Sequence, residues 1–517
     1  MKTTRFAVVL PIVIGSLVSA GLPASADPAS GSEPLNSTAV PSRYTQQTLD
    51  WHLCADAELP SPRPEGTGEL ECATFRTPRD WDHPGQGADL TIAASRLRST
   101  GETTASLFTN PGGPGVPGRP LPAVLRNQSR VRAHQEIIGM DTRGTGRSTS
   151  ISCGTTAAGA DLDARDPAVR GRIADAVRDY EQACQRNSGE LGSLVDTFQN
   201  VKDLDLLRIL LDRPKINWVG YSAGTWLGAH YAQLFPDRTG RFVLDSTTVF
   251  TASWQQSFSL QPYGFERRWR QDFLPWMASY DGKYHFGTTG EAARKSYEDL
   301  RSALGRKPVD LGGTSVGPAV LDDLVVSNLK HKAAFPALAE ILSLILSSSQ
   351  GAAPADRHGA AGVAAAADDE NDVISSATLF AVLCNDGPWT GDRQSVIDRT
   401  GYLAEHGAPL FAGTWMRFQM CAFHQGPTRS LPVMNGQGVP PVLIVQSEHD
   451  PATPIEGARR AHAQFRNSRM ITVTDEGDHD IYVRSGNPAV DRLVEDFLVD
   501  GTVPADQSVR GVGLPRP

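Results

Sequence analysis

The chain has 517 residues, of which 40% are hydrophobic and 21% are charged, and its formal net charge is −9. This apolar content excludes disorder for most of the chain, and no glycine period or sustained heptad indicates collagen or a coiled coil. The negative charge argues against a general nucleic-acid-binding protein. A chain of this length forms two or three domains, or one large domain with an insertion.

The N-terminal segment has the pattern of a secretory signal peptide. Two basic residues precede an apolar run that ends near residue 22, and Ala24-Ser25-Ala26 follows as a small-x-small cleavage pattern. We therefore predict a signal peptide over residues 1–26, followed by a flexible leader or pro-segment over 27–45. A membrane anchor is the alternative, although the run is short for a spanning helix. The mature protein is expected to be soluble, extracellular, free of the membrane and monomeric.

The six cysteines form an even set, which in an exported protein indicates disulfide bonds. Pairing in sequence order is favoured, because each pair is then local and closes a modest loop. A metal site is the alternative, but no CxxC or CxxxC spacing supports it. The expected pairs are Cys54 with Cys72, Cys153 with Cys184, and Cys384 with Cys421.

Short strands and amphipathic helices alternate along much of the chain. Strands are expected at 88–97, 105–109, 135–140, 215–219, 242–244, 442–445 and 470–473, with helices at 200–211 and 490–498. This alternation predicts an α/β fold with a mostly parallel sheet and flanking helices.

The strand pattern is interrupted between residues 251 and 433, where apolar residues recur at helical spacing. Within this stretch, residues 351–372 are rich in Ala, Gly and Asp, which is typical of a surface loop. We therefore expect the first part of the core at 46–250, an inserted helical cap at 251–433, and the C-terminal part of the core at 434–517.

The strongest motif is Gly220-Tyr221-Ser222-Ala223-Gly224, which lies between a predicted strand and a predicted helix. Gly-x-Ser-x-Gly at such a turn is a nucleophile elbow, where only small neighbours let the helix pass close to the strand. The serine hydroxyl then projects at the carboxyl edge of the sheet. A mere tight turn is the alternative interpretation.

A serine nucleophile needs a histidine base, and the histidine needs a carboxylate that fixes its tautomer. After an elbow of this kind the order along the chain is serine, acid and histidine. Asp450 and His479 each follow a late predicted strand, so Ser222, Asp450 and His479 are the predicted triad. No metal or organic cofactor is required for this chemistry.

Several residues are weaker candidates for the triad. Asp478 and Asp480 flank His479, but neighbours in sequence rarely point at one imidazole, and Glu448 and His449 lie beside Asp450. Asp245 ends the strand after the nucleophile, where it is either an alternative acid or a structural cap.

Acyl transfer also needs donors for the oxyanion that develops on the substrate. Asn110-Pro111-Gly112-Gly113-Pro114-Gly115 follows a predicted strand, and its adjacent glycines let backbone amides point inward. One amide of Gly112 or Gly113, with Gly113 preferred, and the amide of Ala223 are expected to form the oxyanion hole. The segment 141–148 is interpreted as a structural brace for the site.

These motifs together resemble the secreted tripeptidyl aminopeptidases of actinomycetes, in the prolyl aminopeptidase-like branch of the α/β-hydrolases. The matching segments are 110–115, 141–148, 220–224, 450–454 and 477–479, and Cys384-Asn385-Asp386 is also similar. The resemblance implies an α/β-hydrolase core with a helical cap that narrows the site. It implies a serine exopeptidase that releases tripeptides, often after proline or alanine, from peptides with a free N-terminus.

The resemblance further implies acidic side chains that hold the substrate ammonium, for which Asp386 and Glu266 are the candidates. Three alternatives remain. The same triad serves an esterase or small-molecule amidase, a shallower site gives a prolyl aminopeptidase that releases single residues, and a non-catalytic binding protein would use the fold without its chemistry.

Overall fold

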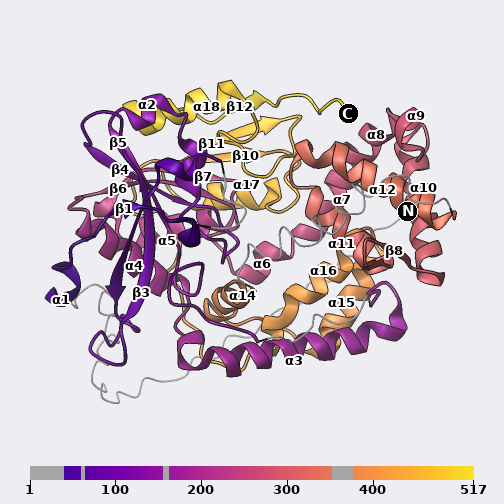
Figure 1. The fold of residues 1–517 in the computed structure, drawn as a ribbon, viewed down its shortest axis with the longest axis horizontal. Coiled ribbons are helices and arrows are strands. Elements are labelled where there is room, and N and C mark those ends of the chain that lie inside the picture. Colours follow the sequence, from indigo (N-terminus) through magenta and orange to yellow (C-terminus); the bar gives the residue numbers. More distant parts are fainter. Residues whose placement is uncertain (1–39, 60–64, 155–161, 352–375) are drawn as a thin grey trace, which may run out of the picture. The chain divides into compact units, whose positions relative to one another are not determined.

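A mostly parallel sheet organises the protein (Figure 1). The computed structural model describes residues 40–59, 65–154, 162–351 and 376–517. The predicted signal peptide, most of the predicted leader and most of segment 351–372 lie outside these described residues. Within the described part, ten strands form one sheet in the order β1-β2-β3-β5-β4-β6-β7-β10-β11-β12.

The strands from β5 to β12 run parallel, and an antiparallel edge precedes them. Every residue of β5 and β10 is buried, as expected for parallel strands that helices cover on both faces. The strands are β1 (His52–Leu53), β2 (Glu71–Thr77), β3 (Leu90–Leu97), β4 (Ala105–Asn110), β5 (Gln135–Met140), β6 (Ile216–Tyr221), β7 (Thr239–Asp245), β10 (Val442–Ser447), β11 (Ser468–Thr474) and β12 (Gln507–Arg510).

The helices of the core are α4 (Thr197–Leu210), α5 (Ala223–Leu234), α17 (Ile455–Gln464) and α18 (Pro488–Glu495). Three of these helices lie where the sequence predicts them, with shifts of a few residues at their ends, and α17 was not predicted. α5 packs against β6 and β7, and its first residue follows Ser222 directly. The predicted fold class, an α/β-hydrolase core with a helical cap between nucleophile and acid, is confirmed.

Among the described residues between β7 and β10, the regular structure is helical apart from one small hairpin. The described α-helices of five or more residues in this stretch are α6 (Trp254–Phe258), α7 (Gln261–Arg267), α8 (Leu274–Ala278), α10 (Gly290–Arg306), α11 (Pro318–Asn328), α12 (Phe335–Ser349), α14 (Ser376–Asn385), α15 (Arg393–Glu405) and α16 (Ala412–Arg417). A π-helical turn, Arg268–Phe273, joins α7 to α8. The small hairpin of β8 (Val309–Leu311) and β9 (Thr314–Val316) was not expected from the sequence.

One helix in the described part, Lys332–Ser349, is long and apolar enough to cross a membrane by length and composition alone. Its apolar face is buried in the protein and packs against α10 and α11. This packing is that of a core helix. The same apolar stripe accounts for the burial of the helix and for its high mean hydropathy.

The cap also receives a helix from outside residues 251–433. The long segment α3 (Pro167–Gly192) precedes the nucleophile, yet it packs against α15 and α16 (Figure 1). The division of the chain into core and cap segments at the predicted residue boundaries stays a prediction.

All three disulfides pair as predicted. Cys54 is bonded to Cys72, Cys153 to Cys184 and Cys384 to Cys421. The second disulfide ties α3 to the segment before it, and the third ties the end of α14 to the segment after α16. Disulfides form and persist in oxidising compartments, so the three bonds are consistent with an extracellular location.

Candidate active site

The turn between β6 and α5 holds Ser222 in a strained backbone conformation. Its φ is 53° and its ψ is −124°, values that a residue with a side chain rarely adopts. The Ser222 amide donates to the Asp245 carbonyl at 3.0 Å, which links the turn to the end of β7. A β-carbon on Gly224 would lie 2.5 Å from the Asn110 carbonyl oxygen, so the helix must begin with a glycine at this position.

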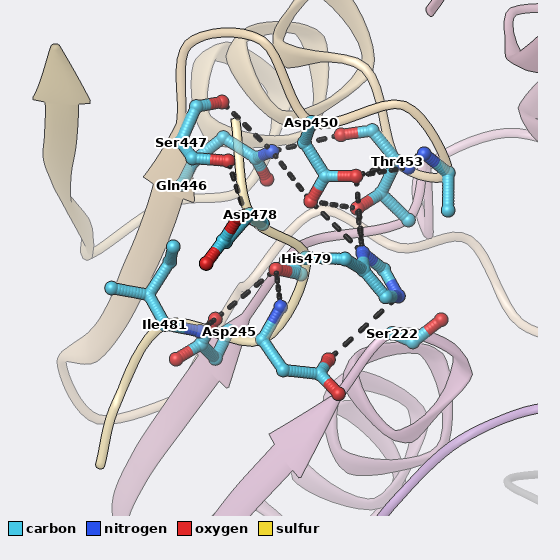
Figure 2. A network of polar contacts seen from close by, with 12 residues as sticks. Ser222, Asp245, Gln446, Ser447, Asp450, Thr453, Asp478, His479 and Ile481 are labelled. Atoms are coloured by element: carbon cyan, nitrogen blue, oxygen red, sulfur yellow. Dashed lines mark hydrogen bonds and ion pairs between the residues drawn. The ribbon is translucent and has the colours of Figure 1, made fainter. Parts of the chain in front are cut away.

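Figure 2 shows the imidazole of His479 beside Ser222, with its Nε2 edge toward the serine. On the other edge, His479 Nδ1 lies 3.0 and 2.9 Å from the two carboxylate oxygens of Asp450. Both side chains are buried. The structure therefore brings together the three residues that the motif order predicted, at the carboxyl edge of the parallel strands.

Asp450 is fixed by donors from its own loop. The amides of Ala452 and Thr453 donate to Oδ1 at 2.9 and 2.8 Å, and the Thr453 hydroxyl donates to Oδ2 at 2.9 Å. Burial alone would raise the pKa of this carboxyl, but His479 and these donors outweigh it and hold the pKa below its usual value. Asp450 is thus an ionised acceptor for His479 Nδ1–H, which leaves Nε2 to act on the serine.

The loop that carries His479 is anchored by Asp245. The fully buried carboxylate of Asp245 accepts from the amides of Ile481 and Tyr482 at 2.9 and 2.7 Å. Burial raises the pKa of Asp245 to about 7, although the two amides act to lower it. Of the two interpretations left open for Asp245, these contacts support the structural cap.

The other acidic neighbours of the predicted triad have different partners. Asp478 accepts from Arg268 Nη2 and from the Lys332 amide, each at 2.6 Å, and both donors belong to the cap stretch. His449 contacts Asp272 at 2.9 Å rather than the nucleophile. The amide of His479 itself donates to the Lys330 carbonyl at 2.9 Å, so the cap also holds the backbone of the predicted base.

The side chain of Asp480 faces the His479 imidazole, although residues adjacent in sequence rarely do so. Its φ of 64° turns the chain directly after His479, and its amide donates to Ser246 Oγ at 2.7 Å. As a result, Asp480 Oδ1 lies 3.7 Å from His479 Nε2, opposite the edge that Asp450 contacts. Burial lowers the pKa of His479, but Asp450 and Asp480 outweigh it and raise that pKa to about 9.

The glycine-rich loop after β4 lies against the start of α5. The Gly112 amide donates to Asn110 Oδ1 at 2.9 Å, which leaves Gly113 as the glycine of the pair that can offer an amide to an oxyanion. A β-carbon on Gly112 would lie 2.8 Å from the Ala223 nitrogen, so this loop and the second predicted donor are adjacent. The positive end of the α5 dipole points at the same place.

A cavity opens next to these amides. Its lining includes Gly112, Ala223 and Trp226 of the core and Trp254 and Val382 of the cap stretch. The two indole rings are stacked, with centroids 3.9 Å apart. The cavity therefore presents aromatic and apolar groups beside polar ones within reach of the nucleophile turn.

The two predicted amine anchors lie in different surroundings. Asp386 accepts from the Thr197 amide at 2.8 Å, from Thr197 Oγ1 at 2.6 Å and from Trp254 Nε1 at 2.8 Å, so it holds the start of α4. Glu266 accepts from Arg270 Nε at 2.5 Å, and its Oε2 is buried without a hydrogen-bond partner. That either residue binds a substrate amine stays a prediction.

Sequence reasoning did not single out Thr453, Ser246 or the inward carboxylate of Asp480. Their roles depend on side-chain contacts across 26 to 234 residues of chain, which no local pattern indicates. Within the described residues, no group of three or more His, Cys, Asp or Glu side chains could hold a metal ion.

Comparison with known proteins agrees with this geometry. The family model for the alpha/beta hydrolase fold matches residues 107–295, and the model for TAP-like proteins matches residues 408–510. The tripeptidyl aminopeptidase of Streptomyces lividans is 35% identical over 501 residues, which cover 92% of this chain and 89% of that protein. The chain belongs to the tripeptidyl aminopeptidase family.

This family membership makes the chain a serine peptidase of the α/β-hydrolase class. More distant relatives have other names. Serine protease Hip1 of Mycobacterium tuberculosis is 26% identical and the match covers 89% of this chain and 90% of that protein. Carboxylesterase B of the same organism is 26% identical over 94% of this chain and 95% of that protein. The match to the model for TAP-like proteins, at residues 408–510, includes both Asp450 and His479.

Proposed function

We propose that this protein is an exported serine exopeptidase that releases tripeptides from the free N-termini of peptides. The observation that carries the proposal is the buried His479 imidazole, held by Asp450 on one edge and facing Ser222 on the other (Figure 2). The identity with tripeptidyl aminopeptidase over most of both chains supports the substrate class. A cap above the site fits an exopeptidase, because it leaves room for a limited number of residues.

In this mechanism Ser222 Oγ attacks the scissile carbonyl while His479 Nε2 takes the hydroxyl proton. Asp450 accepts from Nδ1–H and stabilises the imidazolium that forms. The amides of Gly113 and Ala223 receive the oxyanion, and the start of α5 adds its dipole. His479 then gives its proton to the leaving amine, and water hydrolyses the acyl-enzyme by the same steps in reverse.

The stacked indoles of Trp226 and Trp254 suit an apolar side chain next to the scissile carbonyl. Proline and alanine are side chains of this kind, and either would contact the apolar part of this lining without leaving a buried polar group unpaired. The three disulfides support export, and cleavage after Ala26 would be checked by sequencing the N-terminus of the secreted protein.

The test uses purified mature protein and an Ala-Pro-Ala anilide. It is assayed beside the N-acetylated peptide, a Pro anilide and a short-chain ester. Release of the aniline from the Ala-Pro-Ala anilide with a free N-terminus, and from none of the other substrates, would support the proposal. This activity should be lost in Ser222→Ala and retained in Ser395→Ala. Ser395 is an exposed residue in the first turn of α15, outside the predicted triad, so its variant is a matched control. Preference for the Pro anilide would indicate a site for single residues instead.

Ester hydrolysis is the second candidate, and its support is the match to a carboxylesterase over nearly the whole chain. The triad serves ester and peptide bonds alike, so the elbow and the imidazole do not separate the two. Turnover of the ester without cleavage of any anilide would favour this candidate and contradict the peptidase proposal.

A further inference from the structure

The carboxylate of Asp480 is a polar group in the site that the proposed mechanism does not use. Asp480 is 8% exposed, and its Oδ1 is buried without a hydrogen-bond partner. Its other oxygen, Oδ2, lies 3.4 Å from Arg484 Nη1. A buried acceptor without a hydrogen bond is costly, and a donor that arrives with the substrate would satisfy it.

The position of this oxygen limits what the partner can be. Oδ1 lies 3.7 Å from His479 Nε2, which is too far for a hydrogen bond, so the two atoms face each other without satisfying each other. An atom about 3 Å from both would fit between them. During acyl transfer, the atom that must lie at this distance from Nε2 is the leaving atom of the substrate, because Nε2–H protonates it.

We propose that Asp480 is a specificity-determining residue that accepts a hydrogen bond from the N–H of the leaving amine, and so favours amide substrates over esters. An amide leaving group has an N–H to donate and an ester leaving group has none. An ester oxygen at the same place would meet the carboxylate with its own lone pairs. The inference deepens the proposed function, on which it rests, by giving a structural reason for peptide rather than ester cleavage.

The proton balance of the step is unchanged by Asp480. Ser222 Oγ forms a bond to the carbonyl carbon, and its proton moves to His479 Nε2. When the C–N bond breaks, that proton passes to the leaving nitrogen, which departs as a neutral amine. Asp480 gains and loses no proton. It accepts the N–H that the amide already carries, and it does so most strongly while the nitrogen gains its second proton.

The backbone around Asp480 is built to hold this position. Its positive φ is kept by the Ser246 contact on one side and by the Asp245 contacts to Ile481 and Tyr482 on the other. From the cap, His331 also faces Asp480, and burial lowers the pKa of His331 to about 4, so it is neutral and adds no positive charge beside Asp480.

The test compares two substrates that differ in the leaving atom alone, Ala-Pro-Ala 7-amido-4-methylcoumarin and the corresponding 4-methylumbelliferyl ester. Asp480→Ala removes the acceptor, and Asp480→Asn keeps one acceptor oxygen without the charge. We expect Asp480→Ala to lower kcat/KM for the amide about 10- to 100-fold more than for the ester, the range for one hydrogen bond to a charged group. Asp480→Asn should keep part of this selectivity.

Two further measurements separate this role from a general effect on His479. A fluorophosphonate has a fluoride leaving group without N–H, so its rate of labelling Ser222 reports folding and nucleophile activation alone. In Asp480→Ala, that labelling rate should change by the same factor as kcat/KM for the ester. Loss of Asp480 also removes a negative charge near His479, which should lower the pKa of His479. The pH profiles of kcat/KM for both substrates should therefore shift to lower pH by the same amount.

Equal losses for amide and ester would overturn the inference and leave Asp480 as a residue that only positions or charges His479. A rise in KM confined to substrates with a free amine, and absent for N-acetylated ones, would mean that Asp480 binds the ammonium, which also overturns it. If the wild type cleaves a Pro anilide but not the Ala-Pro-Ala amide, the proposed function is contradicted but the role of Asp480 is not. The ratio of kcat/KM for the Pro anilide to that for the matching Pro ester then tests Asp480. A wild type that cleaves esters and no amide contradicts both.

Discussion

Replacing Asp245 with asparagine tests whether this residue anchors the base or acts as the acid. Asparagine keeps the size of the side chain, but its NH₂ group faces one of the two amides that Asp245 accepts, those of Ile481 and Tyr482. A buried donor that loses its acceptor costs about 1–3 kcal/mol. We therefore expect the free energy of unfolding to fall by about that amount.

Activity should fall too, because His479 lies two residues before the freed loop. Misplacing a catalytic group by about 1 Å costs on the order of 10²-fold, whereas losing the acid of a triad costs about 10⁴-fold. Asp245→Asn should therefore lower kcat/KM by about 10²-fold and lower the denaturant midpoint, and Asp450→Asn should cost about 10⁴-fold. Assays at pH 9 keep Asp245 ionised, since its pKa is raised to about 7.

Asp491→Asn is the matched control, since Asp491 accepts from the Val483 amide at 2.9 Å in the same loop but further from the histidine. It should change kcat/KM by less than about threefold. The reasoning would be refuted by a 10⁴-fold loss in Asp245→Asn with an unchanged unfolding midpoint, which would make Asp245 the acid. Wild-type activity and stability in that variant would refute the anchoring role.

Three further results are expected. Because the base must be neutral and the pKa of His479 is raised to about 9, kcat/KM should rise with pH and reach half its maximum near pH 9; a flat profile from pH 7 to 10 would contradict this. Gly112→Ala should lower kcat by about 10²-fold or more, because its β-carbon would lie 2.6 Å from the Tyr221 carbonyl oxygen. Unchanged kinetics in this variant would exclude close contact between Gly112 and the nucleophile turn. Replacing Cys384 and Cys421 together with serine should lower the free energy of unfolding by about 4 kcal/mol, measured by denaturant titration, because a 37-residue loop is released; an unchanged midpoint would count against the bond.

The elements around the nucleophile could be predicted because they combine strong local signals. Strands β4, β5 and β6 are short apolar runs that end in glycine-rich or polar turns, and parallel strands bring those turns to one edge. The order of serine, acid and histidine then left few choices for the triad. The disulfide pairs could be predicted because each joins two cysteines that are neighbours in the order of cysteines along the chain.

Elements whose buried faces are polar could not be predicted in this way. Helix α3 was missed because Arg170 and Glu181 interrupt the apolar part of its buried face, and Glu181 contacts His424 at 2.7 Å. The edge strand β12 is short and mostly exposed. The orientation of Asp480 depends on a positive φ that only the surrounding contacts impose.

The contact between the cap stretch and the His479 loop has a consequence for how such proteins can be recombined. The Lys330 carbonyl holds the His479 amide, Arg268 and the Lys332 amide hold Asp478, and the Lys332 ammonium contacts Glu476. A cap exchanged with that of a relative would thus carry away part of the support for the base. Chimeras should fail in turnover rather than in substrate choice unless the graft retains Arg268 and the segment 330–332.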